Sequence, residues 1–216
     1  MKPLSNGTER NAKKGRDWRV DWKKYQVDVP EGVSGDLAVE RFTVTEEVLS
    51  RDAMRNAIRG SSRYTLAGTY TRLRQTAGWR DVVMSDTRDE ILDHYEPIRR
   101  ANGRCLVNGL GLGVVANGML MNKDVERVMC IEISQDVINL VAPHWQARWG
   151  DRFEVICADA MTWKPPKGSV FDVVWHDIWI GICSDNLKDM ATLHRRYGKR
   201  CGWQGSWARA LCKRQH

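Results

Sequence analysis

Four short apolar segments in the second half of the chain constrain its fold more than any other feature of the sequence. Each is followed within two residues by a glycine or an acidic residue. The segments are residues 105–107, 125–131, 153–157 and 170–175. Helical patterns at 114–121 and 135–149 separate the first three. Near-continuous apolar strands alternating with helices are typical of a parallel sheet covered on both faces. The sequence therefore predicts an α/β fold.

Local signals refine this prediction. Ser134 is expected to cap the helix that begins at residue 135, and Asp136 in its first turn suits the positive end of the helix dipole. Further helices are predicted at 185–197 and 205–213. Because the residues after the fourth strand have helical patterns, we expect a sheet that is short on its C-terminal side or is completed by a partner.

Residue composition and hydrophobic patterning divide the chain into three parts. Residues 1–24 are polar and basic and predict a flexible N-terminus; residues 25–95 predict a small β-rich appendage; residues 96–216 predict the α/β domain. In the appendage, alternating patterns and turn signals predict strands at 25–29, 37–45, 69–73 and 81–84. A helix is expected over 46–59, with Thr45 as its cap.

Composition narrows the class of protein. Of the 216 residues, 42% are hydrophobic and 28% are charged, which predicts a packed core. No apolar run reaches the roughly 18 residues of a membrane span, and the N-terminus lacks the apolar stretch of a secretory signal. We therefore expect a soluble cytoplasmic protein that makes no contact with a membrane.

Cysteine and histidine usage predicts no metal site. The six cysteines include no C-x-x-C pair, and the five histidines show no zinc spacing. Cys105, Cys130 and Cys157 each lie in an apolar, strand-like segment, so we expect them to be buried as small hydrophobic residues.

Candidate ligand-binding residues follow the strands, since open parallel sheets bind ligands beyond the carboxyl ends of their strands. They are the glycine loop Gly109, Gly111 and Gly113, then Glu132, Asp159 and Asp177. A carboxylate 23 residues after the first glycine can accept both hydroxyls of a ribose, and the next acid can accept from an adenine amine. The glycine run starts before a dinucleotide fingerprint would, and too few residues follow for a second nucleotide-binding half. The pattern predicts a mononucleoside-type ligand.

Over residues 80–180 the sequence resembles the class I S-adenosylmethionine-dependent methyltransferases, whose fold is Rossmann-like, and within them the spermidine-synthase-like branch. It is also similar to short methyltransferase-like proteins of bacteriophages, which would place it in a host cytoplasm. The resemblance rests on the glycine loop, the segment CIEIS with Glu132 and Ile133, the pair Asp159-Ala160, Asp177, and the upstream Arg88-Asp89-Glu90 and His94.

The resemblance implies S-adenosylmethionine as cofactor. Glu132 and Ile133 would lie at its ribose, Asp159 and Ala160 near its adenine, and the glycine loop along its amino-acid arm. His94 would contact its methionine end.

Several positions depart from the spermidine synthases. Leu112 stands where they carry an aspartate in the glycine loop, and Met84 and Asp93 stand where they carry glutamine and tyrosine. These changes disfavour aminopropyl transfer. Val107 replaces an acid common in methyltransferases, and the N-P-P-Y motif of amino-base DNA methylases is absent, since His176-Asp177-Ile178-Trp179 occupies its place.

Methyl transfer from a sulfonium depends mostly on alignment of the reacting atoms, so it needs few catalytic groups. We expect Asp177 to orient or deprotonate the acceptor. Because neighbouring strand residues point to opposite faces, only one of His176 and Asp177 can face the site, and Asp177 is favoured. Trp179 would stack on a planar substrate or pack against the following helix.

The end of the chain concentrates positive charge. The net charge is +7, and residues 193–216 hold seven Lys and Arg residues, no acid, and Trp203 and Trp207. This segment predicts either a nucleic-acid contact or an amphipathic helix that buries Trp203, Trp207 and Leu211 on one face. The exposed edges of a short sheet make a homodimer a further expectation.

The sequence is consistent with three hypotheses about function. The first is an S-adenosylmethionine-dependent methyltransferase with an unspecified acceptor. The second is a spermidine-synthase-like aminopropyl transferase. The third is a non-catalytic module that binds nucleic acid or protein through its basic end.

Overall fold

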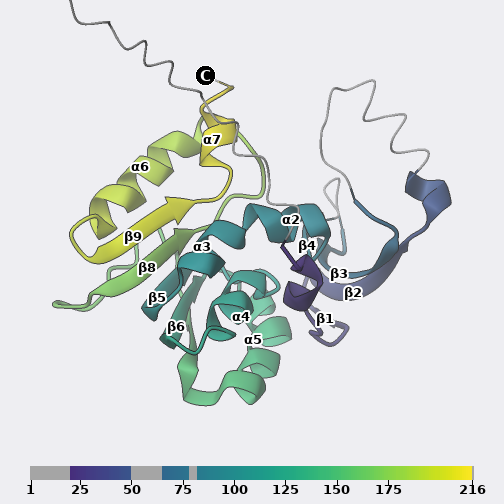
Figure 1. Cartoon of the computed structure of the whole chain (residues 1–216), viewed down its shortest axis with the longest axis horizontal. Coiled ribbons are helices and arrows are strands. Elements are labelled where there is room, and N and C mark those ends of the chain that lie inside the picture. Colours follow the sequence, from purple (N-terminus) through teal and green to yellow (C-terminus); the bar gives the residue numbers. More distant parts are fainter. Residues whose placement is uncertain (1–19, 50–64, 78–81, 216) are drawn as a thin grey trace, which may run out of the picture.

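The computed structural model describes residues 20–49, 65–77 and 82–215, and these residues form two sheets joined by helices (Figure 1). The N-terminal sheet is antiparallel, with strand order β1-β2-β3-β4. Its strands are β1 (Gly32–Ser34), β2 (Leu37–Val44), β3 (Gly68–Gln75) and β4 (Val82–Ser85). The strands predicted at 37–45, 69–73 and 81–84 correspond to β2, β3 and β4, with Asp81 itself outside the described residues.

The main sheet has five strands, and every neighbouring pair is parallel. They are β5 (Gly103–Asn108), β6 (Val125–Glu132), β7 (Phe153–Cys157), β8 (Phe171–His176) and β9 (Cys201–Ser206). The order β7-β6-β5-β8-β9 reverses direction between β5 and β8, which is the switch point of a doubly wound Rossmann-like sheet. The predicted α/β fold with a parallel sheet and a small N-terminal β element is confirmed.

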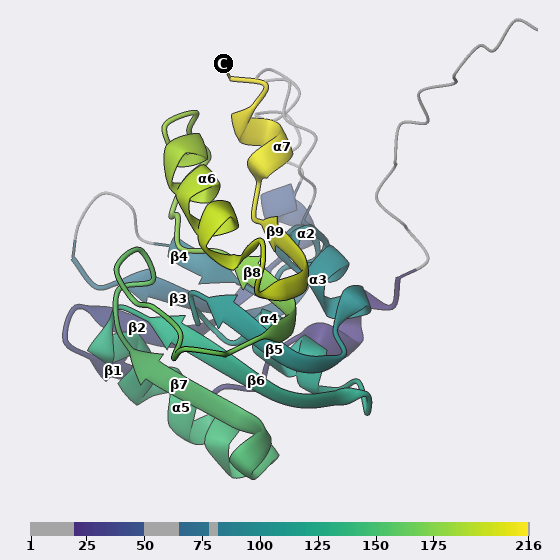
Figure 2. The same ribbon diagram turned by 90° about the vertical axis from the view of Figure 1, so that its left-hand side faces the viewer.

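Both faces of the main sheet are buried, as the continuous apolar strands predicted. Along β5, Cys105 and Val107 join the core under α4 (Val114–Leu120) and α5 (Gln135–Trp149), while Leu106 joins the core under α6 (Asn186–Tyr197). Figure 2 shows α5 and α6 on opposite sides of the strands. Alternate side chains of one strand thus supply two cores.

Short helices complete the fold. α2 (Arg88–Asp93) and α3 (Tyr95–Arg100) precede β5, and a 3-10 helix, η1 (Trp22–Tyr25), precedes β1. A second 3-10 helix, η2 (Gly150–Arg152), leads into β7, and α7 (Arg209–Cys212) follows β9. Within the described ranges, no helix has the length and apolarity that crossing a bilayer requires.

The C-terminal segment differs from its prediction. Instead of a helix at 205–213, the chain forms β9 and the short α7, so Trp203, Trp207 and Leu211 do not share a helix face. Trp203 stacks on Trp175 of β8, with ring centroids 6.3 Å apart and planes 5° apart. A Cβ at Gly205 would lie 2.7–2.8 Å from ring atoms of both tryptophans, so glycine permits the stack. This packing overrides the apparent helical spacing.

Two other predictions need correction, and a third is only partly described. Residues 25–29 form no strand, since the chain passes from η1 into an extended segment without a ladder. Cys105 and Cys130 are buried, but Cys157 is exposed because β7 is an edge strand. Residues 46–49 are helical, and Thr45 Oγ1 caps them by accepting from Val48 N at 3.3 Å; the rest of the predicted helix to residue 59 lies outside the described residues.

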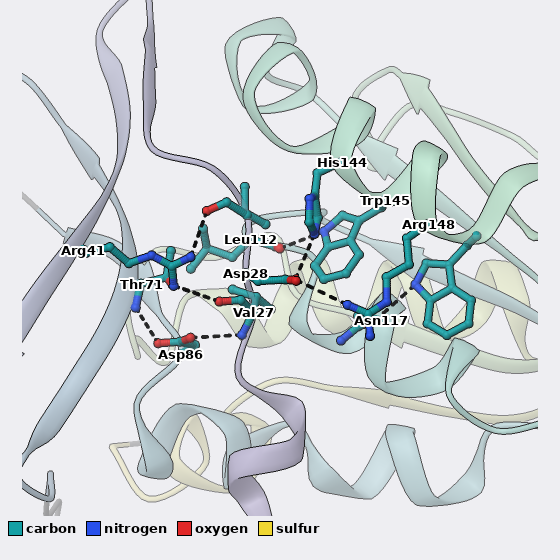
Figure 3. A network of polar contacts seen from close by, with 12 residues as sticks. Val27, Asp28, Arg41, Thr71, Asp86, Leu112, Asn117, His144, Trp145 and Arg148 are labelled. Carbon is teal, nitrogen blue, oxygen red and sulfur yellow. Dashed lines mark hydrogen bonds and ion pairs between the residues drawn. The ribbon is translucent and has the colours of Figure 1, made fainter.

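The extended segment at 27–29 is held by side chains from the N-terminal sheet (Figure 3). The buried Asp86 carboxylate accepts from Val27 N at 3.0 Å and from Thr71 N at 2.7 Å. The Val27 carbonyl accepts from Thr71 Oγ1 at 3.0 Å and from Arg41 Nη1 at 3.1 Å. Each of these buried backbone groups therefore has a partner although the segment belongs to no sheet.

The same segment connects the two sheets. Asp28 Oδ1 lies 3.0 Å from His144 Nε2 and 3.4 Å from Arg148 Nη1, and both partners belong to α5 (Figure 3). A second connection runs from β1, where Ser34 Oγ donates to Asp136 Oδ1 at 2.6 Å. α5 also carries the predicted N-cap, since Ser134 Oγ accepts from Val137 N. These contacts fix the N-terminal part of the chain against α5 from its first turn, at Asp136, to its last, at Arg148.

Candidate functional site

A cavity of about 720 Å³ opens at the carboxyl edge of the main sheet. Its floor comes from the loops that follow β5, β6, β7 and β8, which is where a parallel sheet places its ligand. The antiparallel sheet closes one side through β2, β3 and β4. Of the nine residues predicted to form the site, eight line this cavity: Gly109, Gly111, Glu132, Ile133, Asp159, Ala160, Asp177 and His94.

The glycine loop shapes the floor. Gly109 and Gly111 have φ angles of +96° and +51°, which side chains with a Cβ rarely adopt. A Cβ at Gly109 would collide with the carbonyl of Asp177, and one at Gly111 would collide with the Met84 sulfur. The absence of side chains at these two positions lets the loop after β5 approach the end of β8 and the Met84 side chain of β4 closely.

Gly113 differs in its surroundings from the other two glycines of the loop. It does not line the cavity, and a Cβ there would meet the indole of Trp145. That indole donates from Nε1 to the Leu112 carbonyl at 3.0 Å. The close packing of α5 on the loop therefore requires this glycine, and the sequence spacing alone does not distinguish it from Gly109 and Gly111.

Glu132 ties the loop to the next strand. The residue is only 8% exposed, its Oε2 accepts from Leu110 N at 2.8 Å, and its Oε1 accepts from Ser134 N at 2.9 Å. A carboxylate offers about four lone-pair positions. Two of them hold the protein backbone, so the others remain for a ligand in the cavity.

Asp159 is oriented by its own loop, and that loop is held from α6. Asp159 Oδ1 accepts from Met161 N at 2.7 Å, while no described residue bonds its second oxygen. The Arg196 guanidinium donates to the carbonyls of Ala160, Met161 and Trp163. Arg196, on α6, thereby fixes the loop that contains Asp159 and Ala160, the two residues predicted to lie near the adenine.

Asp177 lies on the cavity floor beside His94. The distance from Asp177 Oδ2 to His94 Nε2 is 3.5 Å, and the Asp177 side chain is 20% exposed. Burial, with the nearby negative charges of Glu90, Asp93 and Glu132, raises the pKa of Asp177 to about 8. Near neutral pH this carboxyl can therefore both bind and release a proton.

His176 faces away from the cavity. It is fully buried, its Nδ1 accepts from Asn108 Nδ2 at 2.7 Å, and its Nε2 lies 3.3 Å from Gln204 Oε1. Burial lowers the pKa of His176 to about 3, so the ring is neutral. Strand alternation thus directs Asp177 to the cavity and His176 into the core beneath α6.

The charge of the cavity lining restricts the ligand. Its described lining includes six carboxyl groups and one imidazole but no Lys or Arg; the acidic residues are Asp36, Glu90, Glu132, Asp136, Asp159 and Asp177. Although the N-termini of α4 and α5 lie at this cavity, the surrounding carboxylates, with no Lys or Arg beside them, disfavour an anionic phosphate. A neutral or cationic ligand suits this lining.

Sequence reasoning missed the wall from the antiparallel sheet. Asp36, Leu73 and Gln75 line the cavity from loops and strands far from the glycine loop in sequence. No local pattern marks them, because only the docking of the two sheets brings them there. The sequence marks Glu90 only as part of the upstream motif. Trp207, predicted either to contact nucleic acid or to share a helix face, lines the cavity.

The sequence matches no protein-family model and no curated protein. Among solved structures, the chain is similar to a putative RNA methyltransferase from Pyrococcus horikoshii, at 15% identity and a TM-score of 0.45, over 59% of this chain and 64% of that one. It is also similar to TrmN from Thermus thermophilus, at 17% identity and a TM-score of 0.44, over 58% of this chain and 40% of that one.

A third similar structure is M. capricolum TrmK in complex with the cofactor product S-adenosylhomocysteine, at 12% identity and a TM-score of 0.40. That alignment covers 50% of this chain and 47% of TrmK. The chain thus spans less than two thirds of each of these three proteins.

The contacts of Arg196 yield a testable prediction. In Arg196→Ala the three carbonyls of the Asp159 loop lose their donor, so we expect faster amide hydrogen exchange at Met161, Thr162 and Trp163. The loss in unfolding free energy should be about 1–3 kcal/mol. The matched control is Arg195→Ala, since Arg195 is exposed and bonds only to Thr192 Oγ1 among the described residues. Equal exchange in the two variants would contradict the positioning role.

Proposed function

We propose that the protein is an S-adenosylmethionine-dependent methyltransferase. One observation carries the proposal: Glu132, Asp159 and the loop at Gly109 and Gly111 converge on a single cavity that no described Lys or Arg lines. The acids suit an adenosine, and a lining of carboxyl groups without Lys or Arg disfavours a pyrophosphate. A nucleoside that carries a positive charge instead of phosphates fits both conditions.

The residues present fit the cofactor. Two ribose hydroxyls could donate to the lone pairs of Glu132 that the backbone leaves open, and the adenine amine could donate to the second oxygen of Asp159. The volume of about 720 Å³ lies within the range of roughly 300–1,000 Å³ typical of small-molecule sites. The sulfonium charge would be stabilised by the surrounding carboxyl groups.

When bound, the cofactor would supply an activated methyl group on a cationic sulfur. Asp177 would accept a hydrogen bond from the acceptor's N–H or O–H group and take up its proton as the new bond forms. His94, 3.5 Å away, would orient the Asp177 carboxyl. The antiparallel sheet and the loop at Trp179 would restrict water from the reacting atoms.

No observation favours aminopropyl transfer as a second function. Leu112, at the position of the spermidine synthase aspartate, is fully buried in the core and does not line the cavity. The loop therefore places no carboxylate where an aminopropyl donor would need one. A host cytoplasm and a homodimer stay predictions from the sequence.

Isothermal titration with S-adenosylmethionine tests the assignment. Asp159→Asn keeps the acceptor for Met161 N and replaces the oxygen that faces the ligand, so we expect binding to weaken about tenfold or more. Glu132→Gln should weaken it at least as much, because an amide nitrogen cannot accept from ribose. Glu126→Gln, exposed on the same strand β6, is the matched control and should bind like the parent protein. Absence of binding to the parent protein would refute the proposal.

The raised pKa of Asp177 predicts a pH dependence of cofactor affinity. A sulfonium cation favours the ionised carboxylate, so binding should tighten as the pH rises toward about 8 and level off above it, by at most about tenfold per pH unit. S-adenosylhomocysteine has the same arms without the charge on sulfur and should lack this dependence. Asp177→Asn should likewise bind S-adenosylmethionine without this dependence.

The pH dependence of the unfolding free energy tests independently whether Asp177 is the group that titrates. The native protein keeps the Asp177 proton up to about pH 8, whereas an unfolded aspartate loses it near about pH 4. The native state therefore binds more protons between these values, and the unfolding free energy should fall as the pH rises through that window. Asp177→Asn should remove this slope. A slope that survives the substitution would assign the titration to another group.

A further inference from the structure

An exposed basic surface lies on α6 and α7 and on the residues directly after each helix; the two helices pack against each other beside the main sheet (Figure 1). No residue from 190 to 215 is acidic. We define the basic surface as the five exposed cations Arg195, Lys199, Arg209, Lys213 and Arg214. Within the part of the chain that the structure describes, none of the five forms an ion pair, so their charges are open to a partner.

The basic surface begins at the rim of the cavity. Trp207 lines the cavity and is fixed by a hydrogen bond from its backbone N–H to the His176 carbonyl at 2.9 Å. Ala208 then takes a φ of +52°, unique among the described non-glycine residues, and turns the chain directly into α7. Arg209 thus follows a cavity-lining indole by two residues.

Charge separates the two regions. The cavity offers carboxyl groups and no Lys or Arg, whereas the surface beside it offers cations and no acid. A partner that reaches both must present anions outside and a neutral or proton-donating group inside. Single-stranded nucleic acid has this arrangement, with phosphates along its backbone and planar bases that can turn away from it.

The aromatic lining favours a base over other groups. Trp179 and Trp207 both line the cavity, together with Ile178 and Ile180. Indole faces stack on nucleobases irrespective of sequence. An acidic peptide would match the cations, but only some of its side chains are planar, whereas every nucleotide brings a base that can stack on an indole, so nucleic acid is the better match.

We infer that the methyl acceptor is a base of a single-stranded nucleic acid, with its backbone on the basic surface and the base between the acids and indoles of the cavity. This inference rests on the proposed function. A base nitrogen would give its lone pair to the methyl carbon, the carbon–sulfur bond would break with its electron pair left on sulfur as a neutral thioether, and the N–H proton would pass to the Asp177 carboxylate.

The test measures binding and methyl transfer with the full chain. Fluorescence anisotropy would follow single-stranded RNA and DNA of one mixed sequence, with salt varied, and transfer would be read from labelled S-adenosylmethionine. The variant R209E/K213E/R214E should bind more than tenfold more weakly, and its salt slope should shrink by about 2, since each phosphate contact on a single strand contributes about 0.7.

The control variant, R104E/K123E/K167E, makes the same charge change among exposed cations at the amino ends of β5, β6 and β8, and should bind like the parent. Trp207→Leu should weaken binding about fivefold or more, but only for strands that contain bases. An abasic strand is the probe for that distinction. The RNA and DNA arms show which sugar the acceptor carries.

The results of these measurements either support or overturn the inference about the methyl acceptor. Methylation of a strand whose binding requires the basic surface supports the inference. Binding of S-adenosylmethionine without specific strand binding, equal losses in the two triple variants, or equal affinity for the abasic strand would overturn the inference and leave the proposed function standing. Failure of the parent protein to bind S-adenosylmethionine would overturn both.

Discussion

The Glu132 carboxylate is the contact on which the site depends. By accepting from Leu110 N and Ser134 N, it joins the loop after β5 to the N-terminus of α5 across the end of β6. Glu132 thus holds the loop at Leu110. The Trp145 indole holds it at a second point by donating to the Leu112 carbonyl. A buried carboxylate bound by two backbone N–H groups keeps its position without a cation beside it. The cavity can therefore remain acidic and still be ordered.

This arrangement has consequences for what the cavity accepts. The acidic lining disfavours anionic ligands, and burial, together with the nearby carboxyl groups of Glu90, Asp93 and Glu132, raises the pKa of Asp177 to about 8. The same acidic, buried environment thus affects both the ligand preference of the cavity and the protonation of Asp177. The five exposed cations of the basic surface lie outside this cavity, on α6 and α7 and directly after them.

Much of this could be predicted because it follows from local periodicity. Apolar strands that each end in a glycine or an acid fix a parallel sheet, and the common edge of such a sheet brings Glu132, Asp159 and Asp177 to one cavity. Three things could not be read this way. Gly113 serves the packing of Trp145, residues 201–206 became a strand through the stacking of Trp203 on Trp175, and the wall from the antiparallel sheet arises only from docking. Each depends on contacts distant in sequence.

The most direct measurement of the central claim is a crystal structure of the protein with S-adenosylhomocysteine. In that structure we expect the ribose hydroxyls to lie within about 3 Å of the Glu132 carboxylate, the adenine amine to lie at Asp159, and the sulfur to face Asp177. Density for the ligand elsewhere on the molecule, or in the cavity with its ribose turned away from Glu132, would contradict it.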